Sequence, residues 1–352
     1  MNKKTTAAAA ALLISAAAFA DGFSVSGYLR AGLSSTLEST PAMSTKTWLS
    51  GIYFNGDSSA TRARLNIAWD GSSASGNSYG SFIRLQYTGT DDGASENWGV
   101  GSISYAQAYA GLFGNVVTVA AGKIKDNWIG SAGFEGYSVL DGKSGAVVTV
   151  TPVKGLNLTG AAIIDPNYVP GNTISMNGDT FLGGVKYKND MFTAMASFAG
   201  YGLFVGNVVY TGTKGLLVSA ETKIDTDHGF YDTLKDQRAL VDEQIQYTGI
   251  DNWTFGLLSF QYFNQKSVAG DSDVTIKITP AAAYQLTSDI RLSVEGTYTM
   301  PVYDNAPKGY ATIVPAVKLS ADKIANVYVW SSISTDQSQS KNSVGLGVIR
   351  EF

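Results

Sequence analysis

The stretch AYAGLFGNVVTVAAGKIKDNW (residues 108–128) decides the fold. It overlaps an uncharged segment, residues 100–122, which is long enough for a transmembrane helix of about 20 residues. A helix there would contain Gly111, Gly114 and Gly122 and the β-branched run 116–119, and both features disfavour a helix. Gly114 and Asn115 instead give a hairpin signal between two apolar-rich runs. The stretch therefore predicts two strands joined by a tight turn.

Alternation with a period of two residues dominates the chain after residue 22, and this period is typical of strands. In residues 23–33, 61–70 and 290–298, one face of each predicted strand is apolar and the other is polar. Similar runs along the rest of the chain give roughly 18 predicted strands of about 9 to 11 residues, the length that crosses a bilayer at a tilt. We expect an all-β fold with 16 to 18 strands.

The connections between these strands alternate in length. Short joints lie at 114–115, 189–190 and 287–289, and residues 200–202 (GYG) break the pattern. Longer polar loops are expected at 35–60, 89–102, 125–143, 165–179, 225–239, 264–273 and 335–341. Short periplasmic turns with longer extracellular loops are typical of an antiparallel up-and-down transmembrane β-barrel. We expect residues 21–352 to form one such barrel, of a size that leaves an aqueous channel.

Composition excludes several classes of function. Residues 1–20 have two lysines, an alanine-rich apolar run and a small-x-small end, which predicts a secretory signal peptide. The remaining chain has 23 basic and 29 acidic residues, which argues against nucleic-acid binding and favours a mild preference for cations. With no cysteine and one histidine, we expect no enzyme, no cofactor and no metal site. The acidic run 225–232 lacks the remaining ligands of a calcium loop.

The end of the chain carries a separate signal. Val344, Leu346, Val348 and Phe352 share one face of a predicted strand. This resembles the C-terminal strand by which the barrel assembly machinery recognises outer-membrane barrels. Arg350 departs from that pattern, which prefers an apolar or aromatic residue there; near lipid headgroups an arginine can snorkel.

Residues 108–124 also resemble the hairpin that precedes the constriction loop of the trimeric general porins of Gram-negative bacteria. That family has an aromatic-x-Gly-Leu strand, a glycine-containing turn, a β-branched strand and a terminal Gly-Arg, where this chain has Lys123. The start of the chain resembles general and sugar-selective porins. The resemblance implies a water-filled channel for small hydrophilic solutes, a homotrimer, and contact with outer-membrane lipid and lipopolysaccharide. It also implies that residues 125–144 fold into the barrel.

The candidate site combines acids on that loop with bases on the wall. The resemblance places Asp126, Glu135 and Asp141 on the constriction loop. The polar strand faces carry the expected basic wall, which consists of Arg30, Arg62, Arg64, Arg84 and Lys123. The sequence around Lys123 does not fix which face of its strand it occupies. Opposed charges at a constriction would sort solutes by charge. The alternatives are an ordinary solvated wall and surface acids, and, for the whole protein, a surface adhesin or structural protein that uses the barrel as a mount for its loops.

Overall fold

A computed structural model of the chain describes residues 22–37, 43–44, 61–89, 102–132, 137–164, 181–200, 202–225, 237–265, 272–302, 308–321, 325–338 and 342–352. The described residues form strands and their connections. No helix among them is long and apolar enough to cross a membrane. The expected signal peptide, residues 1–20, lies outside the described residues.

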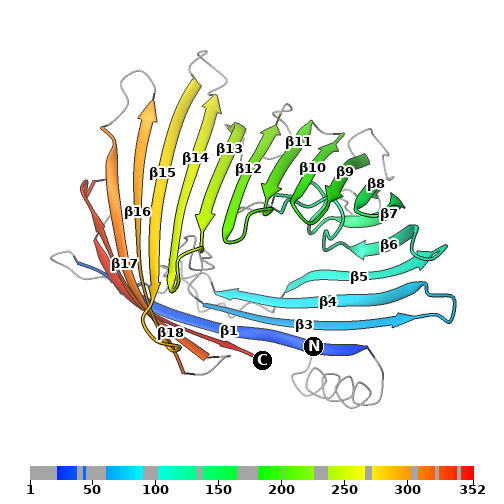
Figure 1. The fold of residues 1–352 in the computed structure, drawn as a ribbon, viewed down its shortest axis with the longest axis horizontal. Coiled ribbons are helices and arrows are strands. Elements are labelled where there is room, and N and C mark those ends of the chain that lie inside the picture. Colours follow the sequence, from blue (N-terminus) through cyan, green and yellow to red (C-terminus); the bar gives the residue numbers. More distant parts are fainter. Residues whose placement is uncertain are drawn as a thin grey trace, which may run out of the picture.

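The strands follow one another around a closed antiparallel barrel (Figure 1). In order they are β1 (Phe23–Thr36), β2 (Met43–Ser44), β3 (Thr61–Ser72), β4 (Ser78–Gly89), β5 (Ser102–Leu112), β6 (Val117–Lys123), β7 (Ser144–Val153), β8 (Leu156–Ile163), β9 (Phe181–Lys188), β10 (Phe192–Ala199), β11 (Leu203–Tyr210), β12 (Leu216–Asp225), β13 (Gln237–Tyr247), β14 (Trp253–Gln265), β15 (Ser272–Gln285), β16 (Ile290–Val302), β17 (Tyr310–Ser320), β18 (Ala325–Ser334) and β19 (Ser343–Glu351). Apart from the two-residue β2, the described chain has 18 strands, which confirms the predicted fold class and strand range.

Closure depends on β1. Its first half pairs with β3, from Phe23 opposite Trp69 to Arg30 opposite Arg62. Its second half pairs with β19, ending with Thr36 opposite Ser343. The two ladders overlap only at residues 28–30, so the first and last strands join with a large stagger. Closing the sheet in this way satisfies the backbone groups of both terminal strands.

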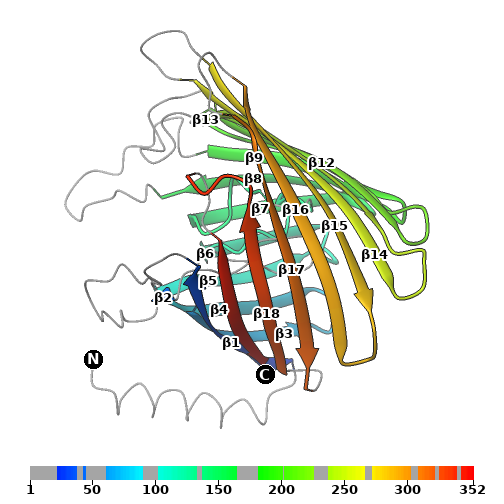
Figure 2. The same cartoon turned by 90° about the vertical axis from the view of Figure 1, so that its left-hand side faces the viewer.

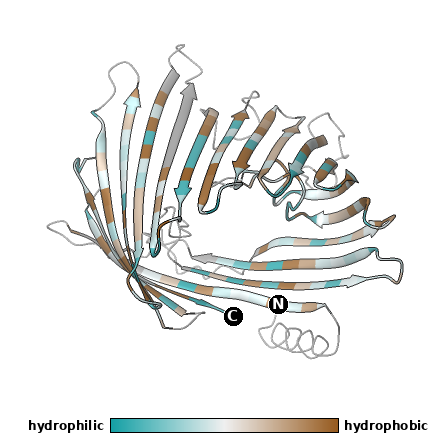
Figure 3. Cartoon of the chain, viewed as in Figure 1, coloured by the Kyte–Doolittle hydropathy of each residue, from teal (hydrophilic) through white to brown (hydrophobic). Residues whose placement is uncertain are grey.

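The alternation of side chains separates the two faces of the barrel. Leu29 is 57% exposed on the outer face, whereas its neighbour Arg30 is 5% exposed on the inner face. On β16, Leu292 and Val294 are likewise exposed on the outer face. Glu295, the next residue, is buried on the inner face. Figure 3 shows hydrophobic and hydrophilic residues alternating along the strands. An apolar outer face and a polar inner face are typical of a barrel that spans a membrane.

The hairpin of β5 and β6 confirms the interpretation of the opening stretch as two strands. Their register runs from Ala106 opposite Lys123 to Leu112 opposite Val117. The turn between them has positive φ at Phe113, Gly114 and Asn115. The Asn115 side-chain oxygen accepts bonds from the backbone N–H (2.7 Å) and the hydroxyl (2.9 Å) of Ser78. The turn is thus fixed to the neighbouring β3–β4 turn at the same rim.

The strand ends that short turns join lie at one end of the barrel, and the strand ends that longer segments follow lie at the other. Figure 2 shows β14, β15, β16 and β17 running side by side. One connection at the long-loop end is short. Residues 200–202 join β10 and β11 directly, with Gly202 N–H bonded to the Ala199 carbonyl at 2.9 Å. The break in the predicted pattern is therefore a real tight hairpin.

Candidate constriction site

The segment after β6 turns inward and packs against the inner wall. Ile124, Ile129, Val139 and Leu140 are at most 1% exposed. They form one cluster with inner-face residues of the wall, namely Ala120, Val147, Ala161, Ile163, Leu182, Met195, Ala199, Leu203 and Val205. Gly184 on β9 makes room for this contact, because a Cβ there would lie 3.0 Å from Cγ2 of Ile129. We name residues 124–143 the inner loop.

Three wall residues also hold the inner loop by hydrogen bonds. Lys186 Nζ on β9 donates to the Gly130 carbonyl at 2.7 Å. Asn207 Oδ1 on β11 accepts from Ala132 N–H at 3.2 Å. Glu221 Oε1 on β12 accepts from Tyr137 N–H at 2.8 Å. The described parts of the loop are thus fixed to wall strands several positions away from β6, where the loop begins.

Asp126 and Asp141 shape the loop that carries them. Asp126 Oδ1 accepts from the backbone N–H groups of Trp128 (2.9 Å) and Ile129 (3.0 Å), and its Oδ2 accepts from the Ser138 hydroxyl. Asp141 Oδ1 accepts from Asp126 N–H at 3.0 Å, and its Oδ2 accepts from the hydroxyl of Tyr105 on β5. All four carboxylate oxygens are therefore engaged. Glu135, the third predicted acid, lies outside the described residues.

The four predicted arginines meet on the inner faces of β1, β3 and β4. Arg30 is directly opposite Arg62, and Arg64 is opposite Tyr28 on one side and Gln86 on the other. Arg84 lies between Ile83 and Leu85 in sequence, and both of these are exposed on the outer face, so Arg84 points inward. Its register partner is Asn66, the next inward residue of β3 after Arg64. The structure thus brings all four into one patch.

Amide and aromatic groups hold these arginines. Arg64 donates to Gln86 Oε1 through Nε (3.0 Å) and Nη2 (2.7 Å). Arg84 Nε donates to Asn66 Oδ1 at 2.7 Å. The guanidinium carbons of Arg64 and Arg84 lie 5.1 and 4.8 Å from the ring centres of Tyr28 and Tyr105. Cation–π contacts of this kind orient a guanidinium without neutralising its charge.

A fifth cation comes from the inner loop, at a position that the sequence did not single out. Lys125 Nζ lies 4.7 Å from the ring centre of Phe82 on β4, and its backbone N–H donates to Gln107 Oε1 at 2.8 Å. Burial, followed by the charge of Arg84, lowers the pKa of Lys125, while Asp141 acts in the opposite direction. The available signal was a basic residue at the first position of the predicted loop, residues 125–144.

Lys123 lies apart from this patch. It is opposite Ala106 and Ser144, which belong to the outer faces of β5 and β7, and its Nζ donates to the Ile103 carbonyl at 2.9 Å. Gly122, the residue before it, has a φ of +122°. The register therefore gives Lys123 the outer face, which differs from the pore-lining position expected for it.

The terminal strand has the predicted faces. Val344, Leu346, Val348 and Phe352 are all exposed on the outer face. Phe352 closes the ladder with β1, because its N–H and C=O bond to Gly27 at 3.0 and 2.9 Å. Arg350 is also exposed. The recognition of this strand during assembly stays a prediction.

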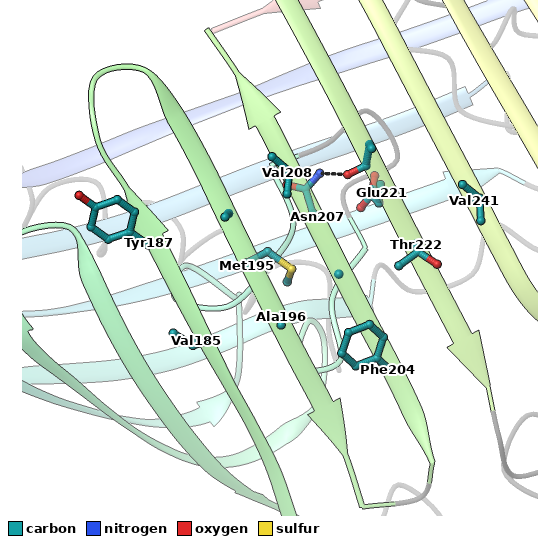
Figure 4. Close-up of a pocket in the computed structure, with 13 residues that line it drawn as sticks. Val185, Tyr187, Met195, Ala196, Phe204, Asn207, Val208, Glu221, Thr222 and Val241 are labelled. Atoms are coloured by element: carbon teal, nitrogen blue, oxygen red, sulfur yellow. Dashed lines mark hydrogen bonds between the residues drawn. The ribbon is translucent and has the colours of Figure 1, made fainter. Parts of the chain in front are cut away.

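The outer face has a shallow groove of about 520 Å³ over β9 to β13 (Figure 4). Small residues, Ala194, Ala196 and Gly206, lie between Val185, Phe204 and Val208 along it. It lies on the opposite side of the sheet from the inner loop. Among the described residues, no group of three or more His, Asp or Glu side chains is placed to hold a metal ion.

Comparisons with solved structures find barrels of the same architecture. A multiple mutant of the Rhodobacter blastica porin matches with a TM-score of 0.50 and 17% identity, over 94% of this chain and 100% of that one. A loop-deletion mutant of OmpT, an outer membrane protein of Vibrio cholerae, matches with a TM-score of 0.56 and 14% identity over the same shares. In-vitro folded OmpT matches with 0.55 and 13%, over 94% and 97%.

The other two comparisons give no relatives. No protein-family model matches the chain. No curated protein matches it either. The likeness to the solved barrels is one of fold, and it covers almost the entire chain. This chain therefore has the fold of the Gram-negative outer-membrane porins.

Proposed function

We propose that this protein is an outer-membrane porin, a water-filled channel through which small hydrophilic solutes and ions diffuse passively. The observation that carries the proposal is the closed barrel of 18 strands with an inner loop docked on its wall. A barrel of 16 to 18 strands is wide enough to leave an aqueous path. The proposed role is that of a channel and not of an enzyme.

The inner loop gives the proposed channel its narrow part. Its apolar side chains face the wall of β6 to β11, and the arginine patch lies on β1, β3 and β4. Solutes would pass between the loop and that patch. In this arrangement the loop sets the width of the channel, and the charged groups of the patch attract or repel the solutes that pass.

Liposome swelling with neutral sugars of increasing mass tests the proposal. We expect swelling that is fast for small sugars and falls steeply with size, because a fixed aqueous path excludes larger solutes. A folded barrel that lets no sugar through would contradict the channel. That result would favour the alternative in which the barrel is a mount for its loops.

We further propose a homotrimer, with residues 1–20 removed as a signal peptide on export and with lipid, lipopolysaccharide and the assembly machinery as partners. The support for a trimer is a row of small outer-face residues that are register neighbours across β5 to β8: Ala108, Ala121, Ala146 and Ala162. A flat surface of this kind lets two barrels approach closely. Native mass spectrometry of Ala121→Trp should show loss of the trimer, whereas Ile278→Trp, at an exposed position on β15, should retain it.

A further inference from the structure

Glu243 places a carboxyl group on the outer face of the barrel. Its neighbours on β13, Asp242 and Gln244, are 1% and 7% exposed on the inner face. Glu243 itself is exposed, as is Ile245 on the same side of the strand. Alternation along a strand therefore points Glu243 away from the lumen. Within the described part of the chain, its carboxyl group makes no hydrogen bond or ion pair.

The depth of Glu243 places it within the apolar band of the wall. Tyr247 ends β13, and Trp253 and Tyr284, whose ring centres are 4.9 Å apart, follow on the next two strands. Aromatic rows of this kind flank an apolar band about 25 Å tall. Glu243 precedes Tyr247 by four residues. At about 3.4 Å per residue and a tilt of about 45°, this separation is roughly 10 Å in height.

A carboxyl group at that depth faces hydrocarbon in the proposed outer-membrane location. Charged side chains inside a membrane are costly, and those that occur almost always pair with one another or face a cavity. Glu243 faces neither the lumen nor a charged neighbour on its own barrel. It therefore indicates a contact with a polar group that comes from outside this barrel.

The groove over β9 to β13 lies next to Glu243 (Figure 4). Ala220 lines the groove, and it is also directly opposite Glu243 in the register of β12 and β13. Small residues on a membrane-facing surface let another protein approach closely. The groove and the carboxyl group thus form one continuous surface, which we name the acidic face.

Lys123 supplies the opposite charge on the outer face of β6. Its ammonium group donates to the Ile103 carbonyl at 2.9 Å, and its other protons can donate elsewhere. Two residues before it on the same side of β6 is Ala121, a member of the alanine row across β5 to β8. We name Lys123 and that row the basic face. The acidic and basic faces adjoin at β8 and β9.

Lys123 and Glu243 also lie at similar depths. Lys123 is six residues from Val117, where β6 begins after its short turn, and Glu243 is four residues from the short turn that follows β13. The difference of two residues is roughly 5 Å in height, which the flexible stem of a lysine can span. Two copies in one membrane share orientation and depth. Lys123 of one copy can therefore meet Glu243 of another.

We propose that the basic face of one copy docks on the acidic face of the next, with an ion pair between Lys123 and Glu243 inside the membrane. The inference rests on the proposed homotrimer and names the surfaces that form it. The contact is heterologous, so each copy uses both of its faces, and three copies close a ring. The pair removes both charges from contact with lipid.

Cysteine cross-linking tests the contact, because the chain has no cysteine of its own. A short bismaleimide added to membranes that hold Lys123→Cys with Glu243→Cys should give linked dimers and trimers on a denaturing gel. Glu243→Cys alone should give no linked species. Lys123→Cys with Val329→Cys is the matched control, because Val329 is 45% exposed on β18, far from both faces, and should also give none. Linked dimers from Glu243→Cys alone would show two like faces in contact and overturn the proposal.

Exchange of the two charges tests the ion pair. In native mass spectrometry, Glu243→Lys should raise the ratio of monomer to trimer at least tenfold, and the addition of Lys123→Glu should restore the wild-type ratio. Asp251→Lys makes the same change of charge in the short turn after β13 and should leave the ratio unchanged. Circular dichroism of each variant checks that the barrel is folded. An unchanged ratio in folded Glu243→Lys would overturn the proposal.

The homotrimer and the contact can be told apart. A wild-type barrel that is monomeric would contradict both. A trimer that neither cross-links through these cysteines nor responds to Glu243→Lys would retain the homotrimer and overturn the contact. Phospholipid that stays bound to the wild type and is lost in Glu243→Gln, with the trimer unchanged, would show that lipid covers the acidic face, and that result also overturns the proposal.

Discussion

Replacing Ile129 with alanine should release the inner loop without unfolding the barrel. Ile129 is fully buried between the loop and Gly184 of β9. Truncation of a buried isoleucine to alanine costs about 2–5 kcal/mol. Because the strand ladders do not include Ile129, this cost falls on the docking of the loop. At about 1.4 kcal/mol per tenfold, the population of undocked loop should rise roughly 30-fold to several thousand-fold.

Two assays follow the loop. Open-channel current noise should increase, and a protease added to the folded barrel should cleave within residues 124–143 faster. Val148→Ala is the matched control, because Val148 lies on the outer face of the same wall and is 45% exposed. It should change neither readout. If Ile129→Ala shows the same current noise and the same cleavage rate as the wild type, the role of this contact in holding the loop is refuted.

Three further predictions concern single residues. Burial and the charge of Arg84 lower the pKa of Lys125, so Lys125 should lose its charge below the usual lysine range near about 10.4, and the reversal potential should shift toward cations as pH rises toward that range. The same shift in Lys125→Met would contradict this. Asp126→Ala should loosen the loop, since it removes acceptors for three donors worth roughly 1 kcal/mol each, and unchanged proteolysis would count against it. Phe352→Ala should lower the fraction of barrel that refolds, measured by heat-modifiable migration, because the Phe352 ring lies over Gly27 of β1; an unchanged fraction would count against a role for this contact.

The architecture could be predicted from the sequence because its signal is local and repeated. Alternation gave the faces of β1, β3 and β16, and the paired glycine and asparagine at 114–115 gave the turn of the deciding hairpin. The inner faces of Arg30, Arg62, Arg64 and Arg84 follow from the same period. Each of these inferences needs only neighbouring residues, so one sequence is sufficient.

The arrangement of the candidate site could not be predicted in full, because it depends on contacts between residues that are far apart in the sequence. Lys123 and Lys125 are two residues apart, yet only Lys125 joins the patch, because β6 ends at Lys123, whose register gives it the outer face, and the chain turns inward after it. Asp126 and Asp141 could be predicted as loop acids, but their use in holding the loop depends on its folded shape. The buried apolar residues of the inner loop also went unrecognised, since they follow no strand period.

The ion preference shows a similar limit. Net charge sums over the whole chain, whereas a solute responds to the charges within about one Debye length, roughly 8–10 Å at physiological salt. Here the basic groups gather on the inner wall while the acidic excess lies elsewhere in the sequence. A sum over the chain therefore does not fix the sign of the charge inside the channel.

Single-channel recording of the purified protein in a planar bilayer tests the central claim most directly. The account predicts discrete upward steps of current in KCl, of similar height from one insertion event to the next, that grow in proportion to salt concentration. A protein with the circular dichroism of a folded barrel that inserts without producing any such steps would contradict a water-filled channel.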